Sequence, residues 1–282
     1  MVSSCYNYKE IYFQRGVLDD SIDATYILHL EGNGRLSNIY KQLQTFHPSK
    51  KVIIVFNKGF KECEKDLYKN TSSYDIVDAF LNVLKDAEEK KYKNILVLED
   101  DFMFNPIILD SKNTDAIATF IKERNEKKES FIYSLGCLPG LQIPINYYNR
   151  RVLVRMGAHA CIYTQECRRK ILNDDQTTIY DWDVYTNLYF TKYMFYQPLC
   201  YQLFPNTENK KNWVYVFLFT EIFNGFLDYL GLDRNVEPGY SFFYFFSIFL
   251  FIFLSILFFY LVVKTGIYLS KSKNSNKLMK NL

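Results

Sequence analysis

The stretch Asn94-Ile95-Leu96-Val97-Leu98-Glu99-Asp100-Asp101 decides the fold, because an apolar, β-favouring run leads directly into three acids. The uncharged run from Ile95 to Leu98 is typical of a strand that is covered on both faces. Ligands of open α/β sheets bind beyond the carboxyl ends of the strands. Three adjacent carboxylates repel one another unless a cation or a cluster of donors faces them. The pattern therefore predicts a binding site at the end of a buried strand.

The residues before this stretch alternate between strand and helix patterns. The predicted elements are a strand from Ala24 to Leu30, a helix from Arg35 to Phe46, a strand from Lys51 to Phe56, a helix from Tyr74 to Lys90 and the strand Ile95 to Leu98. Such a β-α-β-α-β succession predicts a parallel sheet with helices on its faces. The fold class expected is therefore α/β, with a Rossmann-like sheet flanked by helices.

The pattern after the acids is more mixed. Two strands, Arg151 to Arg155 and His159 to Tyr163, are predicted around Met156-Gly157-Ala158. Pro139, Gly140 and Pro144 predict that 138–146 is a loop. A further helix, within 178–190, is predicted to be entered through Asp181-Trp182-Asp183.

Length, charge and cysteine content narrow the class of protein. The chain has 282 residues, a hydrophobic fraction of 49% and a net charge of only +3, so a large core is possible and a nucleic-acid partner is not expected. No C-x-x-C pair occurs, so the sequence does not support a zinc ribbon or a thioredoxin-like motif. We expect reduced, mostly buried thiols. The six cysteines are Cys5, Cys63, Cys137, Cys161, Cys167 and Cys200.

The C-terminal part has the composition of a membrane anchor. No charged residue occurs from Pro238 to Val263, a run long enough to cross a hydrocarbon core of about 30 Å as a helix. The predicted organisation is a polar N-terminal segment (1–20), a globular domain (21–212), an apolar or amphipathic connector (213–237), a transmembrane helix (238–263) and a basic tail (264–282).

Two arguments about membrane topology disagree. The N-terminal residues lack the apolar region of a secretory signal, so a C-terminal anchor would insert after synthesis and leave the domain in the cytosol. The lysines of the tail favour a cytosolic tail instead. We expect a single-pass protein, with the domain in the cytosol on balance because the tail is short enough to be translocated. The sequence leaves open on which side of the membrane the domain lies.

The three acids have a geometry that suits a metal and a phosphate. At the end of a strand, Glu99 and Asp101 point to one side and Asp100 to the other. This pattern predicts Asp101 as a direct ligand of a hard divalent cation, with Glu99 beside it. A solvated acidic turn is the alternative. Receiver domains and phosphatases with an aspartyl nucleophile place their acids after the first strand, whereas these acids follow the third.

Four stretches, taken in order, resemble the glycosyltransferase family 25, which contains lipooligosaccharide and procollagen galactosyltransferases. Glu99-Asp100-Asp101 resembles the family's form of the D-x-D motif, and Tyr26 to Leu30 followed by Arg35 resembles its opening strand and arginine. The other two are Gly157-Ala158-His159-Ala160-Cys161-Ile162-Tyr163-Thr164, in which Cys161 stands where the family often has Tyr, and Asp181-Trp182-Asp183 with Pro198 and Gln202.

The resemblance covers most of 24–212 and implies a GT-A fold, a nucleotide-sugar donor such as a UDP-sugar, Mn²⁺ or Mg²⁺, and inversion at the anomeric carbon. The acceptor would be a glycan, a lipid-linked sugar or a protein. Donor-binding residues would be Arg35, Glu99 and Asp100, and metal ligands Asp101 and Glu99.

Inverting transfer also needs a general base. We prefer Asp183 as this base. Asp181 is the second candidate, because it stands at the helix entry, where an aspartate can have the purely structural role of an N-cap. His159 is a candidate acceptor-binding residue, with a structural role as the alternative.

Two other classes of function remain open. The chain can be a non-catalytic, membrane-anchored interaction protein that keeps a degenerate transferase domain, although the intact acids argue against it. A metal-dependent phosphotransferase or nuclease is less favoured, since no P-loop is present.

Overall fold

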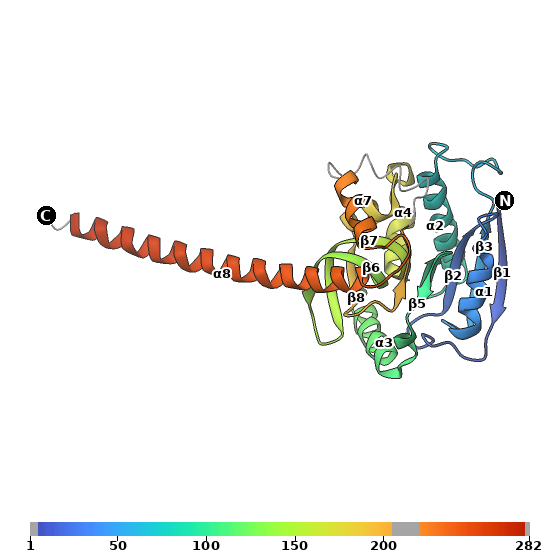
Figure 1. Cartoon of the computed structure of the whole chain (residues 1–282), viewed down its shortest axis with the longest axis horizontal. Helices are drawn as coiled ribbons and strands as arrows, with labels where there is room; N and C mark the ends of the chain where they lie inside the picture. Colours follow the sequence, from blue (N-terminus) through green and yellow to red (C-terminus); the bar gives the residue numbers. More distant parts are fainter. Residues whose placement is uncertain (1–4, 205–219, 280–282) are drawn as a thin grey trace.

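A computed structural model describes residues 5–204 and 220–279, which form a mixed α/β domain and a long C-terminal helix (Figure 1). The main sheet has seven strands in the order β1-β3-β2-β4-β7-β6-β8. They are β1 Tyr6–Tyr12, β2 Ala24–Leu30, β3 Lys51–Asn57, β4 Asn94–Glu99, β6 Phe131–Pro144, β7 Asn149–Thr164 and β8 Thr191–Phe195. A second sheet pairs β5 (Met103–Phe104) with β9 (Cys200–Tyr201).

The helices connect the strands and cover both faces of the sheet. They are α1 Leu36–Thr45, α2 Ser72–Glu89, α3 Ser111–Glu126, α4 Gln165–Asn173, α5 Trp182–Tyr189, α7 Thr220–Tyr229 and α8 Gly239–Met279, with short 3-10 turns at Pro106–Leu109 and Gln176–Thr178.

The predicted β-α-β-α-β succession is confirmed. Strand β2 pairs in parallel with both β3 and β4, so the two crossovers lead to opposite sides of β2. Alternate residues of β4 enter two different cores: Val97 packs in the cluster with α2, and Leu96 and Leu98 pack in the cluster with α1 and α3. This arrangement explains why β4 is apolar at successive positions, because both of its faces are buried.

The antiparallel half of the sheet differs from the prediction. The loop predicted for 138–146 is wrong, since β6 runs to Pro144 and pairs with β7 through several register shifts. Strand β8 pairs with β6 only from Phe131 to Ser134, so the later part of β6 has β7 as its one neighbour in the sheet. Proline is tolerated at such an edge because no ladder donor is lost there. The two strands predicted around Gly157 are one strand, β7.

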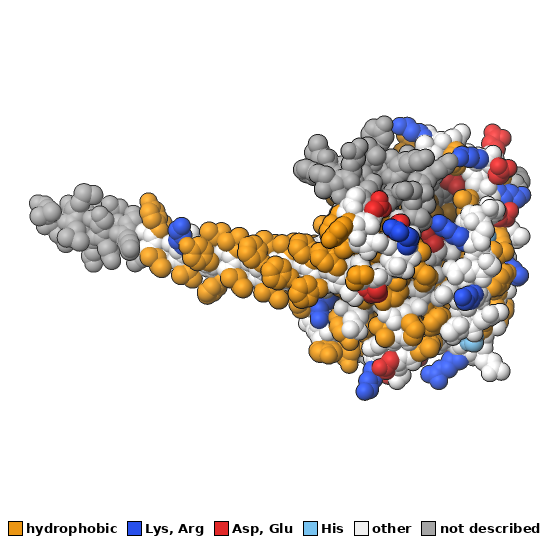
Figure 2. Space-filling view, in the orientation of Figure 1, with side chains coloured by type: hydrophobic (Ala, Val, Ile, Leu, Met, Phe, Trp, Pro, Cys, Tyr) orange, Lys and Arg blue, Asp and Glu red, His pale blue; other side chains and the backbone are white. Residues whose placement is uncertain are grey.

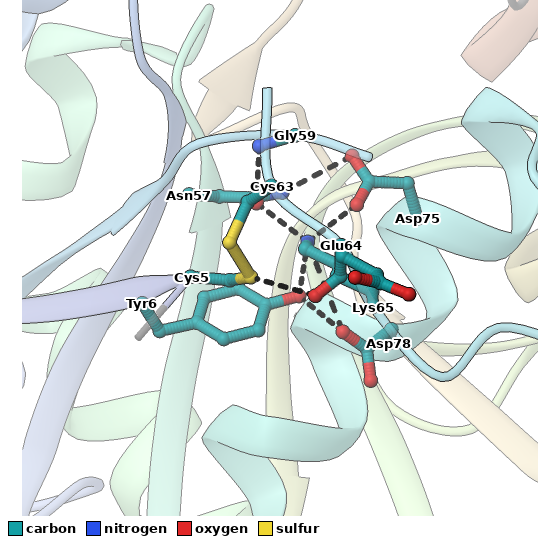
Figure 3. The surroundings of a disulfide bond; sticks show 9 residues. All are labelled: Cys5, Tyr6, Asn57, Gly59, Cys63, Glu64, Lys65, Asp75 and Asp78. Carbon is teal, nitrogen blue, oxygen red and sulfur yellow. Dashed lines mark hydrogen bonds and ion pairs between the residues drawn. A yellow bond between two sulfur atoms is a disulfide. The ribbon is translucent and has the colours of Figure 1, made fainter. Parts of the chain in front are cut away.

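The N-terminal segment contains an edge strand that a disulfide fixes to the domain. Strand β1, within the predicted polar segment, pairs antiparallel with β3. Cys5 and Cys63 form a disulfide, so the prediction of reduced thiols is wrong for this pair and confirmed for the other four cysteines, which are free and buried (Figure 3). The spacing of 58 residues hid the pair, because only the fold brings β1 beside the loop after β3.

Lys65 lies beside this disulfide and is almost completely buried (Figure 3). Its ammonium donates to Tyr6 Oη at 2.8 Å and to Asn57 Oδ1 at 2.7 Å, and it forms an ion pair with Asp75. A buried charge is stable only when it is paired and hydrogen-bonded. This cluster therefore fixes the loop between β3 and α2 in one position.

The C-terminal helix begins as part of the domain and then leaves it (Figures 1 and 2). Tyr240, Phe243, Tyr244 and Ser247 are buried, and this i, i+3, i+4, i+7 spacing places them on one face of α8. Residues Gly239–Leu269 are long and apolar enough to cross a membrane, and most of that stretch is exposed. The predicted boundary between domain and connector, 212/213, lies outside the described residues.

Candidate functional site

The predicted acids lie at the point where the strand order of the sheet reverses. Strand β2 connects through α1 to β3 on one side, and β4 lies on the other side of β2. The carboxyl ends of β2 and β4 are therefore neighbours, and the crevice beyond such a switch point is where open α/β sheets bind ligands. The loop after β2 contributes Asn33 and Arg35, and the turn after β4 contributes Asp100 and Asp101.

Asp100 holds the loop after β2 in place. Its Oδ2 accepts from the Leu30 nitrogen at 3.0 Å and from Asn33 Nδ2 at 2.6 Å, and it lies 3.1 Å from His29 Nδ1. Its Oδ1 accepts from Arg35 Nη1 at 2.8 Å. Burial alone would raise the pKa of Asp100, but the donors His29, Arg35 and Asn33 outweigh burial and lower it. Asp100, predicted to bind the donor, thus has both oxygens engaged within the protein.

The pKa values of Asp101 and Glu99 are raised, whereas that of Asp100 is lowered. Asp101 Oδ2 lies 3.1 Å from Arg35 Nη1, and its Oδ1 accepts from Gln202 Nε2 at 3.0 Å. Burial nevertheless raises the pKa of Asp101. Burial and the charges of Asp101 and Asp183 raise the pKa of Glu99 well above its ordinary value. These carboxylates are therefore close enough to repel one another, which is the condition that a bound cation relieves.

Asp183, the candidate base, lies where its pKa is raised. It lies in the first turn of α5, and its Oδ2 accepts from the Gly157 nitrogen at 3.0 Å. Its Oδ1 is buried, has no hydrogen-bond partner among the described residues, and lies 3.9 Å from Arg155 Nη1. Burial raises the pKa of Asp183 to about 6, against the lowering effect of Arg155. A carboxylate with such a pKa is ionised at neutral pH and still takes up a proton readily.

Asp181 has the structural role that the sequence left open. It is the N-cap of α5, and its Oδ1 accepts from the Val184 nitrogen at 2.9 Å. Burial raises the pKa of Asp181 as well, against its hydrogen bonds to the backbone. The cap bond satisfies a helix donor that would otherwise be unpaired. Asp183, which is not needed for that purpose, is therefore the better candidate base.

His159 is completely buried beside the acids. Its Nε2 lies 3.4 Å from the Cys200 carbonyl oxygen, and the Gln202 side chain also interacts with the ring. Burial lowers the pKa of His159 to about 4, so the ring is neutral at physiological pH. Gly157 faces this ring with a φ of +87°, and a Cβ there would lie 2.9 Å from His159 Nδ1. The ring packs under the site, and its predicted contact with an acceptor stays a prediction.

The donor set fits a cation that is shared with a phosphate ligand. Mg²⁺ and similar ions are commonly held by one or two carboxylates together with substrate phosphates. Glu99 and Asp101 can supply those carboxylates, whereas both oxygens of Asp100 are already occupied. Within 5–204 and 220–279, no group of three or more His, Cys, Asp or Glu side chains could hold an ion. The described residues thus offer two carboxylates, and a cation here would need its other ligands from a bound phosphate or from water.

Sequence reasoning missed two residues at this site. Arg155 is fully buried and donates to the Gly157 carbonyl oxygen at 2.7 Å, so it supports the backbone that holds Asp183. Tyr240 lies in α8, and its hydroxyl accepts from the Gln202 nitrogen at 3.0 Å. A charged residue within a β pattern was a signal for Arg155. Nothing in the apolar run around Tyr240 indicated its contact with Gln202.

A surface cavity of about 610 Å³ lies at the opposite end of strands β2 and β4. Its lining includes Asp23, Asn94 and Gln165, which are near the amino end of β4. Since ligands of this class of sheet bind at the carboxyl ends, we do not assign the site to this cavity.

Comparison with known proteins adds little to this description. No family model matches the chain, and no curated protein matches it. Among solved structures, the protein described as "Crystal Structure of A197 from STIV" is similar over 64% of this chain and 85% of its own, with 15% identity and a TM-score of 0.37. A likeness of this extent carries no argument about function.

Proposed function

We propose that this protein is a membrane-anchored, metal-dependent glycosyltransferase of the GT-A type, which moves a sugar from a nucleotide-sugar donor to a hydroxyl acceptor with inversion. The observation that carries the proposal is the partly buried carboxylate of Asp183, with a pKa of about 6, which lies close enough to Glu99 at the strand switch point for its charge to raise the pKa of Glu99. The resemblance of four ordered motifs to family 25 supports the same function.

The donor side of the proposed reaction needs positive charge for the diphosphate. Arg35 keeps a third of its side chain exposed while Nη1 contacts Asp100 and Asp101, so its guanidinium has surface left to contact a phosphate. A divalent cation at Glu99 and Asp101 would neutralise charge on the departing diphosphate. Gln202 would keep Asp101 oriented through its hydrogen bond.

The acceptor side needs a group that removes a proton. In the proposed step, the acceptor hydroxyl proton passes to Asp183 Oδ2, the acceptor oxygen bonds to the anomeric carbon, and the bond from that carbon to the diphosphate breaks. The side chain of Asp183 is 30% exposed, but Oδ1 is buried, so Oδ2 is the oxygen available to the acceptor. The amide of Gly157 would hold that carboxylate in place.

The test is donor binding and turnover by the full-length protein in detergent. We expect UDP to bind more tightly with Mn²⁺ than with EDTA, and a UDP-sugar from a panel to be hydrolysed or transferred. Asp101→Asn should weaken cation-dependent binding, whereas Asp110→Asn, at the exposed N-cap of α3, should leave binding unchanged. Equal UDP affinity in Mn²⁺ and EDTA overturns the metal assignment. Absence of donor turnover across the panel favours a non-catalytic protein.

A further inference from the structure

Helix α8 is attached to the domain by specific polar contacts as well as by packing. Gln142 of β6 donates from Nε2 to the Tyr244 carbonyl oxygen at 2.6 Å and to Ser247 Oγ at 2.7 Å. Tyr240, Phe243 and Tyr244 join the core cluster that contains Leu138 and Val152 of the β6–β7 pair. The start of α8 therefore has a fixed orientation on the domain.

The length of α8 sets the level of the membrane surface. Residues 239–247 are occupied by packing on the domain, and the apolar stretch continues to Leu269. Residues 248–269 cover about 33 Å at about 1.5 Å per residue, which matches a hydrocarbon core of about 30 Å. Lys264 lies near the far end of this stretch, where its ammonium can reach the headgroups. The domain thus meets the membrane near Ser247.

The β6–β7 hairpin reaches the side of the domain from which α8 leaves (Figure 1). Large apolar side chains are exposed on it, and Figure 2 shows hydrophobic surface on that side. They are Ile145 (41%), Tyr147 (73%), Leu153 (38%) and Val154 (53%).

Tyr147 also packs against Tyr148 and Tyr196, and Arg150 and Arg151 lie on the same hairpin. Tyrosine and arginine beside apolar residues are typical of segments at the lipid headgroups.

The candidate base lies at the stem of this hairpin. Asn187 of α5 exchanges two hydrogen bonds with the backbone of Arg155, at 3.1 and 2.6 Å. Val154, which precedes Arg155, and Leu188, which follows Asn187, are 53% and 70% exposed. Asp183 lies one helical turn before Asn187. Exposed apolar surface therefore borders the region that an acceptor must enter.

The other side of the site is also joined to α8. The Tyr240 hydroxyl accepts from the Gln202 nitrogen, and the Gln202 side chain donates to Asp101. One residue thus separates the candidate metal ligand from the first turn of α8.

We propose that the tip of the β6–β7 hairpin rests in the headgroup layer of the membrane that α8 crosses, and that the acidic site consequently takes a lipid-linked acceptor presented at this surface. The second part rests on the proposed glycosyltransferase function. Of the three acceptor classes that the sequence allowed, a lipid-linked hydroxyl is the one that a site fixed at the membrane surface can reach without leaving it.

The position of the hairpin is tested with the full-length protein in vesicles that contain brominated lipids. We expect the fluorescence of Tyr147→Trp, corrected for the native tryptophans, to fall at least twofold relative to vesicles without bromine. The matched control is Tyr12→Trp, because Tyr12 is 66% exposed on β1, the edge strand far from α8 (Figure 1). Quenching at position 147 no greater than at position 12 overturns the proposal.

The acceptor class is tested in plain vesicles with two probes, the dodecyl and the methyl glycoside of one sugar. We expect at least tenfold faster transfer to the dodecyl glycoside, a ratio that Tyr147→Glu lowers and Tyr68→Glu, at another 66% exposed tyrosine, leaves unchanged. Equal use of the two glycosides by an active enzyme overturns the lipid-linked acceptor while the proposed function stands. If no donor is turned over, the proposed function fails, and the quenching result still decides the position of the hairpin.

Discussion

The backbone nitrogen of Gly157 lies 3.0 Å from Asp183 Oδ2 and donates a hydrogen bond to it. This bond joins the first turn of α5 to the middle of β7, where Gly157 adopts a φ of +87°. A residue with a side chain rarely adopts that backbone angle, so the conformation that turns the amide toward the carboxylate depends on glycine. The position of the candidate base is therefore built into the strand.

Asp183→Asn is expected to reduce turnover by about 10²- to 10⁴-fold with donor affinity nearly unchanged, because a base acts only when the acceptor hydroxyl attacks. Steady-state kinetics and donor titration measure the two effects. Asp181→Asn is the matched control, since asparagine also caps helices well and should retain most of the activity. If Asp181→Asn is the inactive variant and Asp183→Asn is active, the base is Asp181. If both are active, the mechanism is wrong.

Asp183→Asn is also expected to stabilise the protein, in a pH-dependent way. Because the folded-state pKa of Asp183 is raised from 3.8 to about 6, the folded protein binds more protons than the unfolded chain between these values, and stability falls as the pH rises through this window. The folding stability lost at pH 8 is at most about 3 kcal/mol. Solvent screening makes the loss smaller, because the side chain of Asp183 is 30% exposed. Thermal melts in EDTA should show the variant above wild type at pH 8, with the gap closing toward pH 4. A gap that is constant with pH would contradict the raised pKa.

Gly157→Ala is expected to destabilise the protein by about 1–3 kcal/mol, because the new side chain requires an unfavourable backbone angle and its Cβ would lie 2.9 Å from His159 Nδ1. Activity should fall too, since the amide that holds Asp183 must move. Gly225→Ala is the control: it lies in α7, and a Cβ there meets nothing within 4 Å. Chemical denaturation compares the two, and equal stabilities would show that β7 does not need the glycine conformation.

The Cys5–Cys63 disulfide changes the expected topology. Disulfides persist in oxidising compartments, so we now expect the domain on the non-cytosolic side and the lysine-rich tail in the cytosol. The disulfide and the lysine-rich tail then favour the same topology, whereas the sequence alone favoured a cytosolic domain. Rapid alkylation of thiols in cells followed by mass spectrometry should find Cys5 and Cys63 linked. Protease treatment of intact cells or vesicles should place the domain and the tail on opposite sides. A reduced pair in a protease-protected, cytosolic domain would contradict this topology.

Local patterns predicted the parallel half of the fold well. Strands β2, β3 and β4 are short apolar runs, and each is followed or preceded by an amphipathic helix, so period and length alone identified them. The position of the acids at the end of β4 was predictable too, because the change from apolar to acidic residues marks the end of a buried strand in the sequence. The N-cap role left open for Asp181 is confirmed, whereas the role of Asp183 as a base, predicted from its place just inside the same helix, stays a prediction.

Features that depend on long-range contacts were not predictable. Strand β6 continues through Pro139 and Pro144 because its outer part lacks a second strand neighbour, which no local pattern reveals. Asp100 was expected to bind the nucleotide sugar. The hydrogen-bond donors that occupy its oxygens come from the end of β2 and the loop before α1, 65–71 residues away in sequence. Tyr240 was hidden within a run of aromatic and aliphatic residues whose composition indicated only a membrane span.

Because the buried face of α8 belongs to the domain core, the globular unit ends at Ser247, within the apolar helix, and no spacer separates the domain from the exposed apolar part of the helix. A shortened version that stops at Leu232 would leave Leu138, Val152 and Met194 without their covering residues. If the helix crosses a membrane as its length and composition allow, completion of the core and insertion are coupled, because the same segment must be positioned for both. Cutting after residue 247 would test folding apart from the membrane, whereas cutting before α8 would remove part of the core itself.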